Sequence, residues 1–385
     1  MLSTLGRLAR AGYQVCVAAP ASGPLAEALR TEGVEAVPFE PRDAQGVRLP
    51  LDELRRQLAQ ILNRRPPALL HANSLAMGRL SGPVAAELAL PSLSHLRDIV
   101  SLSRQAIADL NCHGRLLAVS EATRQFHLHQ GLADDKTRVL YNGIDLERFR
   151  RRPPTGYLHR QLGLAVDVPL IGTIGQISLR KGHDVLAAAL ANLPSPVLGR
   201  GAEGEGDLLP SPVLGRGAGG EGRSFAWLII GQRFSGKEES RQFEEQLHRA
   251  AAGPLAGRVH FLGQRDDVQR ILNELTLLVH PARQEPLGRV LLEAAAAGLA
   301  IVATDAGGTR EIFPPESEAA CLVPPGDVQA MSIAIDRLLS DAAQRRRLAE
   351  NARRRVEETF DLQRAADGLV KHYEALSHNG ESLLC

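Results

Sequence analysis

The chain has 385 residues, 44% of them hydrophobic and 23% charged, a length that predicts two or three domains at roughly 100–200 residues each. Its 45 Lys and Arg nearly balance its 44 Asp and Glu, and this net charge of +1 excludes a strongly basic nucleic-acid binder, so we expect no nucleic-acid partner. Four widely separated cysteines argue against a disulfide scaffold or a zinc site, and no apolar run approaches the ~20 residues that span a bilayer, which together predict a reduced, cytoplasmic protein.

The first 150 residues alternate short apolar runs with amphipathic stretches. Apolar residues recur every three to four positions, as in helices, within 2–11, 52–63, 78–89 and 121–130. Strands that lead into polar or glycine-bearing loops are predicted at 13–20, 67–73, 115–120 and 137–143. This alternation is typical of an α/β domain with a parallel sheet. Because no strand precedes the helix expected at 2–11, we expect the domain to lack its usual first strand.

The pattern restarts after a basic, proline-containing stretch at 148–157. Further strands are predicted at 169–176, 225–232, 258–263, 275–282 and 299–308, and helices at 182–193, 237–252, 266–274, 288–297 and 327–350. We therefore expect two doubly wound α/β domains, whose ligands bind beyond the carboxyl ends of the strands. The predicted division is an N-terminal domain over 1–150, a linker over 151–167, a C-terminal domain over 168–355, and a helix and tail over 356–385 that packs back toward the N-terminal domain.

An internal repeat interrupts the second domain. Residues 193–206 read LPSPVLGRGAEGEG and residues 209–222 read LPSPVLGRGAGGEG. Each copy holds too few apolar side chains to offset the entropy of ordering it, so we predict a mobile surface insertion at about 194–224. Both copies match G-x-G-x-x-G, but prolines stand where a strand should precede the glycines and no helix pattern follows. The match therefore does not indicate a dinucleotide site.

The stretch 280–312 carries the most informative polar residues. Glu285 stands at a strand-to-helix turn, and Glu293 lies inside the apolar run VLLEAAAAGL, where an unpaired carboxylate is costly. The backbone amides of 287–289 would lie at a helix N-terminus, which favours phosphate oxygens. The alternative interpretation is two solvated glutamates on an amphipathic helix.

This stretch resembles the donor-site signature of the retaining glycosyltransferases of family 4, whose two Rossmann-like domains form the GT-B architecture. Other segments resemble family elements in the same order: HANSLAMGRL (71–80), SHLRDI (94–99), AVSEATRQ, VLYNGIDLERF (139–149), GTIGQISLRKGHDVL (172–186), VHFLGQRDDV (259–268) and CLVPPGDVQAM (321–331). The resemblance covers about 11–375 apart from the insertion.

The resemblance implies transfer of a sugar from a nucleoside-diphosphate sugar to a glycan, a lipid-linked saccharide or a small molecule, with retention at the anomeric carbon. The nucleotide sugar would be a co-substrate, and neither a cofactor nor a metal is expected. The residues agree, because no Asp-x-Asp cluster follows a strand and no His or Cys set has ligand spacing.

On the donor side, the resemblance implies that Lys181 neutralises the diphosphate, that Glu285 contacts the donor sugar near the reacting centre, and that Glu293 binds the ribose. Gln176 stands where the family often has arginine, which removes one fixed positive charge unless Arg180 or another basic side chain replaces it. The full set of implied donor-binding residues is Gly175, Gln176, Arg180, Lys181, Leu262, Gly263, Pro286, Leu287, Gly288 and Glu293. Residues 286–288 are expected to present backbone amides to the sugar and diphosphate.

On the other side of the expected cleft, His95 matches the histidine that faces the donor sugar. With Glu285 and Lys181 it completes the predicted catalytic set. His71 and Asn73 are weaker acceptor-side candidates, because polar residues at strand ends often only cap the backbone. Glu311 is interpreted as a helix-start residue.

Two other functions remain open at this point. A catalytically impaired nucleotide-sugar-binding protein would fit the early start, because family members place a strand and a glycine-rich turn ahead of the segment that corresponds to 2–19. A sugar-nucleotide epimerase has a similar architecture. Basic residues at 148–152 and 345–347 are candidates for peripheral contact with the inner membrane face, although a solvated charged surface is the ordinary interpretation. The sugar, the base, the acceptor and the oligomeric state are not predicted.

Overall fold

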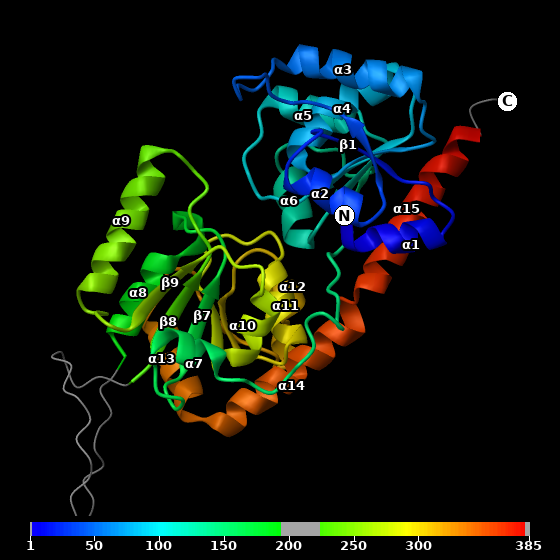
Figure 1. Cartoon of the computed structure of the whole chain (residues 1–385). Helices are drawn as coiled ribbons and strands as arrows, with labels where there is room; N and C mark the ends of the chain where they lie inside the picture. The colour runs from blue at the N-terminus through cyan, green and yellow to red at the C-terminus, as the bar shows by residue number, and fades with distance from the viewer. Residues whose placement is uncertain (1, 194–223, 382–385) are drawn as a thin grey trace, which may run out of the picture.

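The computed structural model describes residues 2–193 and 224–381, and these residues form two α/β domains. In Figure 1 the N-terminal domain, blue to cyan, lies above the C-terminal domain, green to yellow. Every strand pair that forms a sheet is parallel, so the expected class, two doubly wound domains in the GT-B arrangement, is confirmed. The predicted insertion at 194–224 falls, apart from its last residue, outside the described residues.

The N-terminal domain has a four-stranded sheet in the order β3-β4-β5-β6 and a separate pair β1-β2. Its strands are β1 (Cys16–Ala19), β2 (Glu35–Pro38), β3 (Leu70–Ala72), β4 (Ser92–Leu96), β5 (Arg115–Ala118) and β6 (Thr137–Val139). Its helices are η1 (Leu2–Thr4), α1 (Leu5–Arg10), α2 (Pro24–Thr31), α3 (Leu51–Arg64), α4 (Leu75–Glu87), α5 (Arg104–Asn111) and α6 (Glu121–Leu128). The predicted strands and helices of this half are all present, and β2, β4, α2 and α5 are additional.

The C-terminal domain is built on one six-stranded sheet in the order β12-β11-β10-β7-β8-β9. Its strands are β7 (Leu170–Ile174), β8 (Ala226–Ile230), β9 (Val259–Gly263), β10 (Leu277–His280), β11 (Ile301–Thr304) and β12 (Cys321–Val323). Its helical segments are η2 (Leu179–Lys181), α8 (His183–Ala191), α9 (Glu238–Ala252), α10 (Val268–Glu274), α11 (Arg289–Ala296), α12 (Thr309–Ile312), η3 (Pro315–Ser317), α13 (Val328–Ser340) and α14 (Ala342–Thr359). The strand order reverses between β7 and β10, and the loops beyond such a reversal leave a crevice in which ligands bind.

Two predicted boundaries differ from the structure. The range 151–167, expected as a linker, contains α7 (Tyr157–Leu162), whose Leu158 is fully buried in the core of the C-terminal domain. The single helix expected at 327–350 is two helices, α13 and α14. The break occurs at Asp341, whose carboxylate accepts a hydrogen bond from the Gln344 amide and so caps the start of α14.

The last helix, α15 (Leu362–Glu381), returns from the C-terminal domain to the N-terminal one, as the red helix beside α1 in Figure 1 shows. Its Leu369 and Tyr373 are buried there and pack in one cluster with Leu8, Leu93 and Leu117. Ile144 lies in the segment that joins the domains. Its amide donates to the carbonyl of Phe360 and its carbonyl accepts from the amide of Leu362, the residues on either side of Asp361. None of the helices within the described residues is long and apolar enough to cross a membrane.

Candidate functional site

An ion pair joins the two loops at the strand-order reversal of the C-terminal domain. Lys181, in the loop after β7, places its Nζ 2.5 Å from Oε2 of Glu285, in the loop after β10. His280, the last residue of β10, places Nε2 2.7 Å from the same oxygen. Glu285 is 6% exposed and His280 is 2% exposed, so the cluster is withdrawn from bulk water. The structure thus brings together two predicted catalytic residues and adds a histidine that the sequence did not single out.

The charges in this cluster are set by burial and by the neighbours. Burial acts to raise the pKa of Glu285, but the hydrogen bond from His280 and the ammonium of Lys181 outweigh it and lower the pKa to about 2. Burial lowers the pKa of His280 despite the adjacent carboxylate, so that imidazole is neutral at physiological pH. Glu285 is therefore an ionised carboxylate that accepts from a neutral N–H and from an ammonium.

Close backbone contacts hold these loops. Gly307 has a φ of +56°, and a Cβ there would come 2.0 Å from the carbonyl oxygen of Glu285. Gly182, directly after Lys181, has a φ of +69°, and a Cβ would come 1.9 Å from the carbonyl oxygen of Pro281. Both positions therefore require glycine. Arg283 adds a further tie, since it donates to the Leu179 carbonyl and pairs with Asp184 at 2.7 Å.

Glu293 lies on α11, one helical turn after Arg289, and is 9% exposed. Burial raises the pKa of its carboxyl, and the guanidinium of Arg289, 3.3 Å away, opposes this. The helix begins after Gly288, and no acceptor for the amides of Leu287 and Gly288 is found within the described residues. Helix-start amides of this kind suit an anion, and their contact with a diphosphate stays a prediction.

Pro286 departs from that expectation, because proline has no N–H to present to a ligand. Its carbonyl oxygen instead accepts hydrogen bonds from the hydroxyls of Ser120 and Thr123 in the N-terminal domain. The loop that carries Glu285 is thereby fixed to the opposite domain. The loop after β10 and the start of α6 thus form one contact between the domains.

The remaining predicted donor-side residues lie at neighbouring strand ends. Gly175 and Gln176 follow β7, Arg180 lies in η2 beside Lys181, and Leu262 and Gly263 end β9. All of these residues are partly exposed. They therefore line the same carboxyl edge of the sheet as the ion pair.

On the N-terminal side, the two predicted histidines touch. Nε2 of His71, on β3, lies 2.7 Å from Nδ1 of His95, on β4, and Nδ1 of His71 lies 2.6 Å from the hydroxyl of Tyr373 on α15. Burial, with the charge of Arg97, lowers the pKa of His71 to about 3, and burial, with His71 and Arg97, lowers that of His95 well below its usual range. Both rings are therefore neutral, and the C-terminal helix contributes to a chain of three polar groups that no sequence motif indicated.

Asn73 directly follows β3 and holds Arg97, which, like His280 and Tyr373, the sequence did not single out. Arg97 donates from Nε to the Asn73 carbonyl at 3.1 Å and from Nη2 to its side-chain oxygen at 2.8 Å. Its Nη1 donates to the side-chain oxygen of Asn142, in the connection between the domains, at 2.8 Å. Asn73 therefore positions a guanidinium and does not simply cap backbone.

Glu311 has a structural task that differs from the predicted one. Its two carboxylate oxygens accept from the backbone amides of Glu121 and Ala122 at 2.7 and 2.8 Å, and one also accepts from the Tyr141 hydroxyl at 3.0 Å. It therefore caps α6, a helix of the opposite domain. Its own helix, α12, has only four residues.

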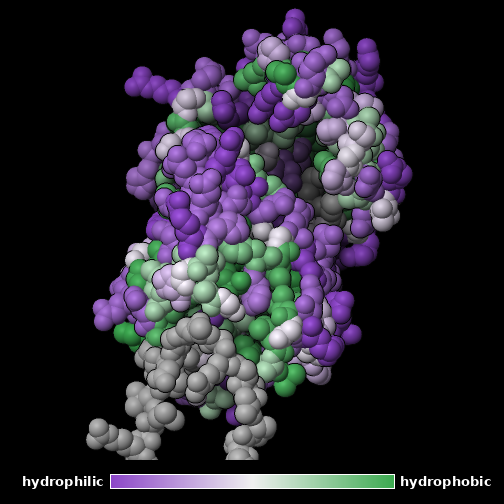
Figure 2. Space-filling view, turned by 60° about the vertical axis from the view of Figure 1, so that its left-hand side comes forward, coloured by the Kyte–Doolittle hydropathy of each residue, from purple (hydrophilic) through white to green (hydrophobic). Residues whose placement is uncertain are grey.

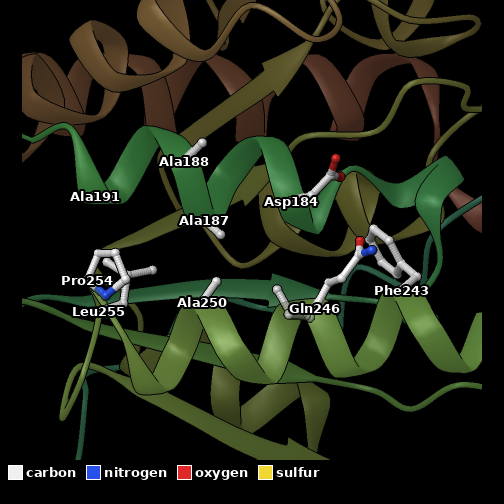
Figure 3. Close-up of a pocket in the computed structure, with 10 residues that line it drawn as sticks. Asp184, Ala187, Ala188, Ala191, Phe243, Gln246, Ala250, Pro254 and Leu255 are labelled. Carbon is white, nitrogen blue, oxygen red and sulfur yellow. The ribbon is translucent and has the colours of Figure 1, made fainter.

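The surface is hollowed in the upper part of the molecule and is largely polar around the hollow, as Figure 2 shows. A different cavity, of about 220 Å³, lies between α8 and α9, where alanines of the two helices face each other (Figure 3). None of the predicted site residues lines that cavity. Within the described residues, no group of three or more His, Cys, Asp or Glu is arranged to hold a metal ion.

Comparison with known proteins finds similar sequences and a similar fold. The chain is 27% identical over 212 residues to the lipopolysaccharide core biosynthesis glycosyltransferase LpsE and 26% identical over 245 residues to the mannosyltransferase LpsB, both of Rhizobium meliloti. These alignments cover 55% and 63% of this chain but only 51% and 62% of those relatives. The structure of HepE from Anabaena in complex with UDP and glucose has a TM-score of 0.77 at 22% identity and covers 96% of this chain and 95% of that one.

Two family profiles match in succession. The profile of Glycosyltransferase Family 4 matches residues 1–148, and that of Glycosyl transferases group 1 matches residues 157–355, which is 199 of the 385 residues. Because the second profile alone spans more than half of the chain and contains the Lys181–Glu285 pair, the chain belongs to the glycosyl transferases group 1 family.

Proposed function

We propose that the protein transfers a sugar from a nucleoside-diphosphate sugar to an acceptor, with retention of anomeric configuration and without a metal ion. The observation that carries the proposal is the Lys181–Glu285–His280 cluster at the strand-order reversal, close to the unpaired amides of Leu287 and Gly288. A cation and helix-start amides at one sheet edge suit a diphosphate, whose negative charge grows as the sugar leaves.

Within this proposal, Lys181 has two partners in turn. In the free protein its ammonium is paired with Glu285. A bound diphosphate would compete for that ammonium, and Arg180 would add the charge that Gln176 does not supply. Glu285 would contact the donor sugar near the anomeric carbon, and its ionised form can stabilise positive charge that develops there.

The other residues would recognise the rest of the donor. Glu293 would accept hydrogen bonds from two ribose hydroxyls, while Leu262 and Gly263 would contact the base. Gly175 would leave room for the diphosphate beside Gln176. His95, at the end of β4, would face the donor sugar from the acceptor side.

The first test is binding and turnover of a panel of UDP-, GDP- and ADP-sugars by the full chain. We expect one donor to raise the melting temperature, because saturating ligand at 100 times its Kd adds about 2.7 kcal/mol. We also expect Lys181→Met to weaken binding of that donor at least about tenfold, whereas Lys237→Met, on the surface at the start of α9, should not. Equal donor affinity of the two variants would contradict the assigned site.

Retention and metal independence need separate readouts. NMR of the product formed from an α-linked donor should show an α-linkage. Turnover should survive EDTA. A β-linked product would overturn retention, loss of turnover that Mg²⁺ or Mn²⁺ restores would overturn metal independence, and a changed sugar in reactions without acceptor would indicate the epimerase.

A further inference from the structure

Arg97 is a partly buried cation whose hydrogen-bond partners are all neutral. Its three bonds go to the carbonyl and side-chain oxygens of Asn73 and to the side-chain oxygen of Asn142. Burial lowers the pKa of its guanidinium to about 10, which still leaves it charged at neutral pH. The arginine is thus fixed in place without a compensating negative charge in contact with it.

The hydrogen-bond count leaves capacity for a ligand. A guanidinium has five N–H donors, and three of those of Arg97 are used. One N–H on each terminal nitrogen has no acceptor within residues 2–193 and 224–381. Two such donors in one plane match the two oxygens of a carboxylate or a phosphate.

The surroundings reinforce the positive charge. Arg289, at the start of α11 in the other domain, lies near enough to lower the pKa of Arg97 by repulsion, and it also pairs with Glu293 at 3.3 Å. Asp98 acts in the opposite direction, but it is exposed and forms no ion pair with Arg97 in the part of the chain that the structure describes. His71 and His95, whose pKa values the charge of Arg97 helps to lower, are neutral and add no negative charge.

We infer that Arg97, held by Asn73 and Asn142, forms a subsite for an anionic group, a phosphate or a carboxylate, carried by the acceptor. The subsite lies on the acceptor side because Arg97 follows the same strand, β4, that carries His95. An anion that binds there satisfies the two free N–H groups and offsets the cost of the buried charge. The inference rests on the proposed function and specifies the acceptor as acidic.

Three variants separate a ligand site from a purely structural arginine. Arg97→Gln removes the charge. Asn142→Asp keeps the arginine and its hydrogen bond but gives it a carboxylate partner, so it neutralises the subsite without cutting the tie. Arg115→Gln is the matched control, because Arg115 is also a part-buried arginine of this sheet but lies at the opposite, amino-terminal end of β5 and donates to His372.

The first measurement is titration of inorganic phosphate into the full chain saturated with UDP, which fills the donor diphosphate site. We expect Arg97→Gln and Asn142→Asp each to weaken phosphate binding at least about tenfold, and Arg115→Gln to leave it unchanged. If Arg97→Gln does not fold, Asn142→Asp alone decides. Phosphate affinity of either folded variant equal to that of the unaltered chain overturns the subsite.

The second measurement compares acceptors that differ only in charge: glucose, glucose 6-phosphate and glucuronic acid, and the matching mannose set. We expect the unaltered chain to prefer a charged member at least about tenfold in kcat/KM, and Arg97→Gln to lose that preference. Equal use of charged and uncharged acceptors overturns the inference, as does a defect of Arg97→Gln in UDP affinity alone. Donor hydrolysis without acceptor, measured in parallel, reports on the proposed function itself: if it is present while the charge preference is absent, only the subsite fails.

Discussion

Glu285 and Glu293 are both buried glutamates of the C-terminal domain, yet their surroundings shift their pKa values in opposite directions. Glu285 is held ionised by Lys181 and His280, with a pKa lowered to about 2. Glu293 pairs with Arg289, and burial raises its pKa. Their ionised forms should therefore contribute to stability with opposite signs.

At pH 7 we expect Glu285→Gln to lower the free energy of unfolding by about 2–3 kcal/mol, because it leaves the largely buried Lys181 ammonium without its counter-charge. Glu293→Gln should raise it by about 1 kcal/mol, because a buried carboxylate is replaced by a neutral amide. Urea unfolding followed by the fluorescence of Trp227, the single tryptophan of the chain and a core residue of this domain, measures both. Shifts of the same sign would contradict the assignment.

The pH dependence tests the same idea independently. The folded pKa of Glu285 lies below its ordinary value of 4.5, so its contribution is full above pH 4.5 and is lost as the pH falls toward about 2. The loss of stability of the unaltered chain between pH 4.5 and pH 3 should be smaller in Glu285→Gln. Glu293→Gln should keep this loss, since the raised pKa of Glu293 gives stability that is present below pH 4.5 and declines as the pH rises through the folded value.

The direction of the Tyr373–His71–His95 hydrogen-bond chain depends on the tautomers of its two histidines. Burial raises the pKa of Tyr373, so the phenol is protonated, and His71 is the one acceptor near its hydroxyl within the described residues. If the phenol donates to Nδ1 of His71, Nε2–H of His71 donates to Nδ1 of His95. His95 then presents an N–H donor at Nε2.

Tyr373→Phe removes the proton that fixes this direction. We expect kcat of the transfer reaction to fall about tenfold with little change in the KM for the donor, and the pH profile of kcat to change, because the tautomer of His95 is no longer fixed. Nitrogen-15 NMR of the histidine rings reads the tautomers directly. Tyr13→Phe is the control, because Tyr13 packs edge-on against Tyr373 at 5.2 Å without joining the chain. A tautomer of His95 unchanged in Tyr373→Phe would rule the relay out.

At the scale of the elements, strand β4 shows where sequence patterns fail. All five of its residues, SLSHL, are buried, but three of them are polar, so the run does not read as a strand. Two of the three polar side chains have partners elsewhere, since Ser92 bonds His113 and His95 bonds His71. The hydroxyl of Ser94 is buried without a hydrogen-bond partner among the described residues. Strands such as β8 and β10, whose buried residues are nearly all apolar, were predicted within two residues at either end.

In the candidate site, too, some features could be predicted from the sequence and others could not. The loops after β7 and β10 could be placed together in advance, because both follow strands of one parallel sheet. The roles of Arg97 and Tyr373 could not be predicted, since they depend on side chains that meet from strands or helices far apart in sequence. His280 lies only five residues before Glu285, and its contact depends on the path of the short loop between them. Glu311 was placed at a helix start, but a helix-start carboxylate does not reveal in the sequence whether it caps its own helix or one in another domain.

Glu311 connects two elements, α12 and the start of α6, across the domain boundary. Glu311→Gln keeps the size of the side chain but loses the negative charge that faces the amides of Glu121 and Ala122. We expect stability to fall by about 1–2 kcal/mol, with the start of α6 exchanging its amide hydrogens faster. Hydrogen exchange with mass spectrometry localises the effect. Glu316→Gln, an exposed glutamate on η3, should change neither quantity, and unaltered exchange at α6 in Glu311→Gln would refute the cap.

At the scale of the whole molecule, the two domains share a hydrophobic core cluster and are also joined by helix α15. Val119 and Ile144, from the N-terminal side, belong to the same hydrophobic core cluster as Leu287 and Phe360 of the C-terminal side. Helix α15 then carries the chain back across the boundary, where Arg7 of α1 pairs with its Asp367. The stability of the N-terminal domain therefore depends on residues at the far end of the sequence.

Leu369 of α15 tests this dependence. It is 3% exposed and packs with Leu8, Leu93 and Leu117, so Leu369→Ala should cost about 2–5 kcal/mol. The loss should fall on the N-terminal domain, so far-UV circular dichroism should show a first unfolding step at lower urea while Trp227 fluorescence, in the other domain, still reports native packing. Ile333→Ala on α13, whose side chain is exposed, should leave both transitions in place. If circular dichroism and Trp227 fluorescence shift together in Leu369→Ala, the shared core, and not α15 alone, makes the two domains unfold as one unit.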